Sequence, residues 1–260
     1  MTEHEHREAL CEIGRRVWQR GFVAANDGNF SVRLEHGRVL ATPTLISKGF
    51  MAPEDLVIVD LDGNLIEGRR RPTSELKVHL HAYRRRADVR AVVHAHPPHA
   101  TAFCIARRDV PRCVLPEIEL FIGEIPLVPY ATPGTGEVTD SIDPFLAQHN
   151  VFLLASHGAL TFGDDPFQAY YRMETLDQYC RILLLARQLG DWTQLDFDAM
   201  RRLLKVKERW GVPEHRDQSS YSALCATPPA KDQNEAPSSF DEKTIERIVR
   251  EVLHRRGLLP

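Results

Sequence analysis

Residues 87–96 have the sequence ADVRAVVHAH, a short apolar and β-branched run that ends in two histidines. Such a run predicts a buried strand. Residues two apart on a strand point to the same face, so His94 and His96 are expected to project side by side. Two converging imidazoles favour zinc or a similar divalent metal ion. The chain contains twelve histidines, however, so one H-x-H pair can also arise by chance.

A metal site of this kind needs a further ligand. The best candidate is His157, in the sequence LLASHGALTFG at residues 153–163, where an apolar strand meets a glycine. Binding residues commonly lie where strands open into loops. Four other histidines compete for the same role: His79, His81, His99 and His149.

The rest of the chain alternates between helical and extended patterns. Helices are predicted at residues 5–21, 73–86, 98–107, 138–149, 165–189 and 196–209. Strands are predicted at residues 29–34, 38–43, 55–66 and 151–156, with further short strands around 112–130. Because strands are joined both by hairpins and by helices, the predicted fold class is α/β, with a mixed sheet covered by helices.

Composition excludes several functions. The 260 residues carry a net charge of −3, so no overall basic character indicates nucleic acid as a partner. No apolar run approaches the roughly 18 residues of a membrane span, and the charged, helical N-terminus does not resemble a signal peptide. The cysteines form no CxxC pair and are expected to be reduced thiols in a cytoplasmic protein: Cys11, Cys104, Cys113, Cys180 and Cys225.

Glu75 stands at the start of a predicted helix, with Thr73 or Ser74 expected near the cap. A carboxylate beside an open zinc site can bind the ion or act as a general base. The commoner role of a glutamate in a first helical turn is to stabilise the helix dipole.

Two segments have the composition of anion-binding sites. Gly28 and Asn29 are expected in a turn with available backbone N–H groups, and Thr73 and Ser74 begin a helix where N–H groups and hydroxyls suit phosphate. A hairpin turn and an N-cap are the alternative explanations.

The C-terminal part differs in composition from the rest. We expect a globular domain at residues 1–211, a flexible Pro/Ser/Ala-rich linker at 212–238 and a helix at 239–260. Ser239 and Glu242 would form a capping box. A narrow apolar stripe follows at helical spacing.

Taken together, these segments resemble the class II aldolase/adducin family over about residues 5–210. The matching motifs are GNFSVR, ATPT, RPTSE, VVHAHPPHATA, PYATPGT and SHGALTFG, in the family's order and spacing. The resemblance is strongest to members that act on L-fuculose 1-phosphate.

The resemblance implies a three-layer α/β/α fold with a mixed, mostly antiparallel central sheet, and a fourfold homotetramer with sites between subunits. It implies a zinc ion held by His94, His96 and His157. Glu75 would be the catalytic acid and base. The phosphate-binding positions of the family fall on Asn29, Thr44, Thr73 and Ser74, to which the turn at Gly28 adds backbone N–H groups.

The implied reaction is cleavage of a ketose 1-phosphate, L-fuculose or L-rhamnulose 1-phosphate, to dihydroxyacetone phosphate and lactaldehyde. Zinc would act as the Lewis acid. Three positions depart from the family: Leu45 replaces a glycine of the phosphate loop, and Leu115 and Trp210 stand near its two tyrosines. Four residues could substitute for the tyrosines: Tyr130, Tyr221, Glu117 or Glu119.

Other interpretations remain open. L-ribulose-5-phosphate 4-epimerases share the three histidines but typically carry aspartate at the position of Glu75, and aldolases of methylthioribulose or 5-deoxyribulose 1-phosphate share the chemistry. An adducin-like scaffold would lack the metal histidines. A structural zinc site would usually have four protein ligands.

The helix expected at residues 239–260 resembles an encapsulation peptide, which docks an apolar stripe on the shell of a bacterial microcompartment. The alternatives are a helix that folds on its own core or an arm that stabilises a tetramer. A membrane-surface helix is disfavoured because the stripe is narrow and lacks interfacial aromatic residues.

Overall fold

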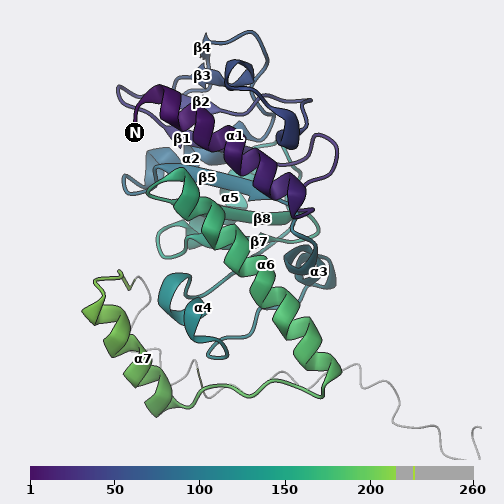
Figure 1. Cartoon of the computed structure of the whole chain (residues 1–260), viewed down its shortest axis with the longest axis vertical. Coiled ribbons are helices and arrows are strands. Elements are labelled where there is room, and N and C mark those ends of the chain that lie inside the picture. The colour runs from purple at the N-terminus through teal and green to yellow at the C-terminus, as the bar shows by residue number, and fades with distance from the viewer. Residues whose placement is uncertain (215–224, 226–260) are drawn as a thin grey trace, which may run out of the picture. The chain divides into compact units, whose positions relative to one another are not determined.

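The computed structural model describes residues 1–214 and 225, and its centre is an eight-stranded sheet (Figure 1). The strands are β1 (Asn29–Arg33), β2 (Val39–Ala41), β3 (Val57–Val59), β4 (Leu65–Glu67), β5 (Ala91–Ala95), β6 (Leu127–Val128), β7 (Val151–Leu154) and β8 (Gly158–Gly163). Their order is β4-β3-β2-β1-β5-β8-β7-β6. All neighbouring pairs are antiparallel except β6 and β7. The predicted mixed, mostly antiparallel sheet is therefore confirmed.

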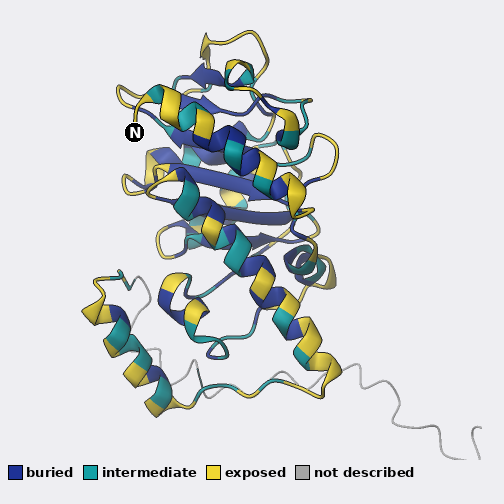
Figure 2. Ribbon diagram, in the orientation of Figure 1, coloured by how far each residue is buried: buried dark blue, intermediate teal, exposed yellow. Residues whose placement is uncertain are grey.

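Helices cover both faces of the sheet, which gives three layers (Figure 1). One face packs against α1 (Glu3–Gln19), α3 (Pro98–Ala106) and α6 (Pro166–Gln188). The other face packs against α2 (Leu76–Arg85) and α5 (Glu137–Leu146). The central strands are dark blue, and hence buried, along their length in Figure 2. Val92 and Val93, adjacent on β5, belong to opposite cores, as the period of a strand requires.

The predicted helices correspond to observed ones, α7 (Phe197–Arg209) included. The short strands predicted around residues 112–130 are largely wrong. That segment contains the helix α4 (Pro116–Phe121), and its only strand in the described structure is β6. Pro116 occupies an early position of α4, and Glu117 and Glu119 lie in its first turn. Proline and acidic residues there favour a helix start, and this outweighed the β-branched residues nearby.

Thr73 and Ser74 lie next to the cap of α2, as expected, but neither is the N-cap residue itself. Its N-cap residue is Glu75, whose side chain makes no capping hydrogen bond, and Thr73 and Ser74 precede it. The Thr73 hydroxyl instead accepts a hydrogen bond from the Glu75 backbone N–H at 3.4 Å. The Glu75 side chain is therefore left available for other contacts.

The expectation of reduced cysteines is wrong for one pair. Cys113 and Cys225 form a disulfide, whereas Cys11, Cys104 and Cys180 are free and buried. The paired residues are 112 positions apart in the chain and have Cα atoms 5.8 Å apart. Spacing along the sequence cannot reveal such a pairing.

The linker at 212–238 and the helix at 239–260 lie, apart from residues 212–214 and 225, outside the described residues. Within the described ranges, no helix combines the length and apolarity needed to cross a membrane.

Candidate active site

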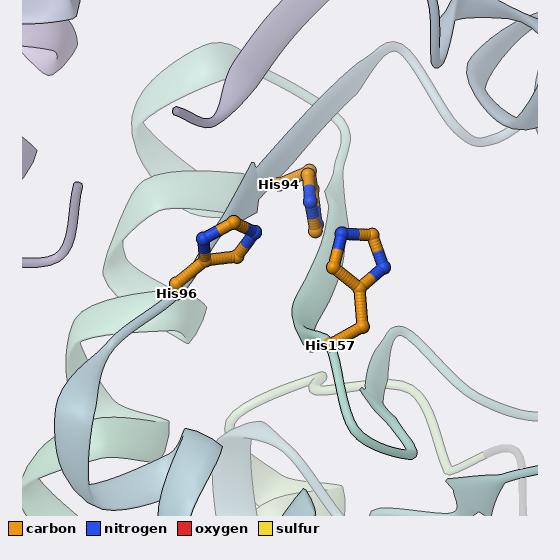
Figure 3. Close-up of side chains that lie close together, drawn as sticks. All are labelled: His94, His96 and His157. Carbon is orange, nitrogen blue, oxygen red and sulfur yellow. The ribbon is translucent and has the colours of Figure 1, made fainter. Parts of the chain in front are cut away.

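Three histidines lie together at one end of the sheet (Figure 3). His94 is on β5, His96 follows that strand, and His157 is in the turn between β7 and β8. Their ring centroids are 4.6–5.1 Å apart. One nitrogen from each ring lies within 4.8 Å of the others. The sequence-predicted ligands are thus brought together, and the competing candidates His79, His81, His99 and His149 are not members of this cluster.

The ring nitrogens of this cluster fit a metal ion. His94 Nδ1 lies 2.9 Å from the carbonyl oxygen of Ala159, which leaves Nε2 for the cluster. Nε2 of His94 and Nε2 of His96 are buried, and neither has a hydrogen-bond partner among the described residues. Buried polar atoms are normally paired, so these nitrogens suit a cation that would satisfy them.

The protonation state supports the same role. Burial, followed by the neighbouring His157 and His96, holds the pKa of His94 well below its usual range. Burial also lowers the pKa of His157, although the Glu75 carboxylate opposes this effect. Neutral imidazoles are the form that binds a metal ion.

Glycine at position 158 permits the histidines to converge. A Cβ there would lie 2.5 Å from His96 Cδ2 and 2.6 Å from the carbonyl oxygen of Ala95. Gly28 has a similar role on the other side, because it has φ +73° and a Cβ would lie 3.0 Å from the carbonyl oxygen of His94. Any larger side chain would push these segments apart.

Glu75 faces the histidine cluster. Its Oε1 lies 3.4 Å from His157 Nε2, and its Oε2 lies 3.5 Å from His94 Nε2. The side-chain amide of Asn29 donates a hydrogen bond to Oε2 at 2.7 Å. The carboxylate is therefore held at the open side of the cluster by a residue from β1.

The candidate phosphate segments are adjacent to one another. The Thr44 backbone N–H donates to the carbonyl of Arg71 at 3.0 Å, and the Thr73 N–H donates to that of Thr42 at 3.2 Å. These N–H groups are consequently occupied, so any anion contact at Thr44 or Thr73 must come from the hydroxyl. Ser74 is exposed beside the loop at Gly134, where a Cβ would lie 3.9 Å from the Ser74 Cβ.

A pocket extends from the cluster between α2 and α5. Its lining includes Glu75, His94, His157, Lys77, Gly134 and Thr135. The last two belong to the PYATPGT motif. The sequence had not identified Lys77, which is exposed on α2.

Sequence reasoning also missed two charged residues near the cluster. Asp27 Oδ2 lies 3.5 Å from His96 Nδ1. Lys48 is buried and donates hydrogen bonds to two carbonyls in neighbouring loops. For Asp27, its position directly before Gly28 could have indicated a place near the site. For Lys48, nothing in the surrounding sequence SKGF indicates a functional role.

The departures from the family pattern have clear structural positions. Leu45 is exposed and has φ +57°, a conformation that favours the glycine it replaces. Leu115 is the N-cap residue of α4. Trp210 stacks on Phe121 with ring centroids 6.3 Å apart. Tyr130 and Glu117 are exposed and Glu119 is buried, whereas Tyr221 lies outside the described residues.

Comparison with known proteins identifies the family. Residues 8–184 match the Class II Aldolase and Adducin N-terminal domain. The chain belongs to the class II aldolase family. It is 31% identical over 186 residues to 3-oxo-tetronate 4-phosphate decarboxylase of Haemophilus influenzae, covering 70% of this chain and 88% of that protein. It is 33% identical over 180 residues to L-fuculose phosphate aldolase of Methanococcus maripaludis, covering 69% and 97%.

Solved structures of class II aldolase relatives have the same fold. YgbL from Klebsiella pneumoniae matches with a TM-score of 0.73 and 29% identity, over 78% of this chain and 99% of that one. L-Fuculose 1-phosphate aldolase matches with a TM-score of 0.72 and 27% identity, over 78% and 96%. This class II aldolase homologue is accordingly an enzyme of the lyase type, from a family whose catalysis depends on a metal ion.

Proposed function

We propose that this protein is a zinc-dependent aldolase that cleaves L-fuculose or L-rhamnulose 1-phosphate to dihydroxyacetone phosphate and lactaldehyde. The observation that carries the proposal is the position of Glu75, whose carboxylate oxygens lie 3.4 and 3.5 Å from two of the three clustered imidazoles. A carboxylate there can move a proton on a substrate that a metal ion held by the cluster would polarise.

His94, His96 and His157 would hold the ion. Three neutral ligands leave a divalent ion its full charge, and when bound it would supply a Lewis acid for the negative charge of an enediolate. Zinc is favoured because the set is all imidazole, with an open position. The similarity to L-fuculose phosphate aldolase supports the same chemistry.

Glu75 would act on carbon. Cleavage of the C3–C4 bond would release the C4 hydroxyl proton to water and leave an enediolate; Glu75, having taken up a proton from water, would then deliver it to C3 and return to the carboxylate form. In the synthetic direction it removes that proton. Asn29 holds Glu75 Oε2 by a hydrogen bond of 2.7 Å, so the carboxylate is oriented before substrate arrives.

The phosphate group would bind along the segments that β1, β2 and α2 place together. We assign it to Gly28, Asn29, Thr44, Thr73 and Ser74, with hydroxyls from Thr44, Thr73 and Ser74 and N–H groups from the turn at Gly28. The hydroxyl contacts follow from the internal use of the Thr44 and Thr73 backbone N–H groups.

A second function has specific support. The chain is 31% identical to a 3-oxo-tetronate 4-phosphate decarboxylase. Loss of carbon dioxide from such a substrate also leaves an enediolate, which Glu75 would protonate. Aldol cleavage needs a base for the C4 hydroxyl, whereas decarboxylation does not. Leu115 and Trp210 offer no such base at the positions where the family has tyrosines. Decarboxylation is therefore the second candidate function.

Other family activities are less well supported. An L-ribulose-5-phosphate 4-epimerase would typically have aspartate in place of Glu75. Aldolases of methylthioribulose or 5-deoxyribulose 1-phosphate would use the same cluster on a different sugar. A non-catalytic adducin-like scaffold does not explain three converged histidines, two of which have a buried ring nitrogen without a hydrogen-bond partner among the described residues.

The test is dihydroxyacetone phosphate release from L-fuculose 1-phosphate, L-rhamnulose 1-phosphate and 3-oxo-tetronate 4-phosphate, with epimerisation of L-ribulose 5-phosphate measured in parallel. We expect release from one of the two ketose 1-phosphates, its loss with a chelator and its loss in Glu75→Gln. Release only from 3-oxo-tetronate 4-phosphate would establish the decarboxylase. Epimerisation alone would contradict both the aldolase and the decarboxylase.

The assembly and location are proposals from the sequence. We propose a homotetramer with sites between subunits, cytoplasmic or in the lumen of a bacterial microcompartment, with residues 239–260 as the segment that binds a shell protein. Confinement would retain an aldehyde product.

A further inference from the structure

Lys48 is a buried lysine whose charge the proposed reaction does not use. It begins the 3-10 turn η1 (Lys48–Phe50), and the residue is only 1% exposed. Nζ donates hydrogen bonds to the carbonyl oxygens of Asn26 at 2.9 Å and Ile46 at 2.8 Å. Among the ion pairs of residues 1–214, none joins Nζ to a carboxylate.

This arrangement is costly for stability alone. Burial lowers the pKa of Lys48 to about 8, although the carboxylates of Asp27 and Glu75 oppose the shift. Two neutral carbonyls compensate only part of the desolvation of an ammonium group. A methionine would fill a similar volume without that cost, so the charge calls for a functional explanation.

The two carbonyls belong to the two loops that carry candidate phosphate residues. Asn26 leads into Gly28 and Asn29, and Ile46 follows Thr44 and Leu45. Lys48 therefore joins the loop before β1 to the loop after β2. Thr42 makes a second connection, because its hydroxyl accepts from Phe30 N–H at 3.1 Å and its carbonyl accepts from Thr73 N–H at 3.2 Å.

An ammonium group has three donors, and the described residues account for two of them. The carbonyls carry no net charge, so the positive charge of Lys48 is not neutralised locally. Asp27 and Glu75, the acidic groups that act on it, lie at the histidine cluster. A phosphate dianion bound between these loops would be attracted by the positive charge of Lys48. The environment is poorly solvated, so charges interact strongly there.

We propose that Lys48 is a positioning residue for the substrate phosphate: it fixes the Gly28–Asn29 loop against the Thr44–Leu45 loop, and its buried charge attracts the dianion without touching it. The inference rests on the proposed function only in assigning the anion to a sugar phosphate. Binding of inorganic phosphate tests it without any turnover.

The experiment compares the zinc-loaded full chain with Lys48→Met, Lys48→Arg and Lys205→Met. Lys205 is exposed on α7, so its substitution removes the same charge far from the loops. The dissociation constant of inorganic phosphate is measured by calorimetry, and KM and kcat are measured with whichever sugar phosphate the enzyme cleaves. Circular dichroism and zinc content verify folding. Lys48→Gln replaces Lys48→Met if the latter does not fold.

We expect Lys48→Met to raise both the phosphate dissociation constant and KM by about tenfold or more. The change in kcat should be less than threefold, as expected when ground-state and transition-state binding are weakened equally. Lys48→Arg should recover most of the affinity, and Lys205→Met should match wild type. An unchanged phosphate dissociation constant in Lys48→Met, or a fall in kcat with KM unchanged, would overturn the proposal. A wild-type protein that does not bind phosphate would also overturn it.

If phosphate binding depends on Lys48 but no sugar phosphate is cleaved, the proposed function fails while the role of Lys48 stands. If cleavage occurs and phosphate binding is independent of Lys48, the proposed function stands and the role of Lys48 fails.

Discussion

Asn29 donates its side-chain amide to Oε2 of Glu75 across 2.7 Å. This hydrogen bond joins β1 to the N-cap position of α2, between two residues that are 46 positions apart in the chain. The same carboxylate lies within 3.5 Å of His94 and His157. Asn29 therefore fixes the direction in which Glu75 can transfer a proton.

Removal of this hydrogen bond should slow the chemical step. We expect Asn29→Leu to lower kcat by about 100-fold, because small errors in the position of a catalytic group cost about that much. The change is measured by steady-state kinetics with the preferred substrate. A variant with wild-type kcat and raised KM would show that Asn29 contacts only the phosphate.

Loss of one clustered imidazole should remove the metal. We expect His94→Ala to bind zinc at least about 100-fold more weakly, because two imidazoles and a carboxylate form a poorer site. Competition with a chromogenic chelator measures the affinity. The control is His4→Gln, which changes an exposed histidine on α1. Unaltered zinc affinity in His94→Ala would show that the metal, if any, binds elsewhere.

Stability should depend on pH through His79. It is fully buried, its Nδ1 lies 2.7 Å from the Ser31 hydroxyl, and burial lowers its pKa from 6.5 to about 3. The unfolded chain takes up the proton first as pH falls. The contribution of His79 is thus complete above pH 6.5 and is lost progressively toward pH 3.

Lowering the pH from 7.5 to 5 should reduce the free energy of unfolding by about 2 kcal/mol through the protonation of His79 in the unfolded chain. Urea unfolding at several pH values measures it for wild type and His79→Met. We expect a flatter pH dependence in the variant, although its stability at neutral pH will be lower. Parallel curves for the two proteins would mean that His79 does not titrate as described.

Leu45 should be strained by its backbone conformation. Its φ is +57° and its side chain is 80% exposed, so little packing is lost when it is shortened. We expect Leu45→Gly to be more stable than Leu45→Ala by about 1 kcal/mol, because only glycine adopts this conformation without cost. Thermal or urea unfolding tests this. An alanine variant at least as stable as the glycine variant would contradict the assignment.

The C-terminal segment should act as a targeting signal for a microcompartment. Fusion of residues 235–260 to a fluorescent reporter should direct it to microcompartments in a cell that assembles them, and removal of the segment should disperse the enzyme. Fluorescence microscopy measures the distribution. Indistinguishable distributions with and without the segment would contradict a shell-binding role.

The sequence predicted the sheet because runs of β-branched residues are bounded by turn residues, and it predicted that His94 and His96 share a face because a strand has period two. It also ranked His157 first as the third ligand, because an apolar strand meets a glycine there. His157 is 61 residues beyond His96, so the local pattern left four other histidines as competitors, and the family motif was needed to set them aside.

Other features had no local signal. The helix α4 was missed because its β-branched neighbours concealed the start at Pro116. The pairing of Cys113 with Cys225 depends on proximity in three dimensions. Lys48 looks like an ordinary polar residue in SKGF, and only the structure shows that it is buried between two loops.

The most direct test of the central claim is proton exchange at the hydroxymethyl carbon of dihydroxyacetone phosphate in D₂O, followed by NMR. This half-reaction requires the histidine cluster and Glu75 but no aldehyde, so it does not depend on the identity of the sugar. We expect the zinc-loaded enzyme to catalyse exchange and Glu75→Gln to be slower by about 10³-fold, within the range for loss of a general base. Exchange at the wild-type rate in Glu75→Gln would show that another group moves this proton and would contradict the account.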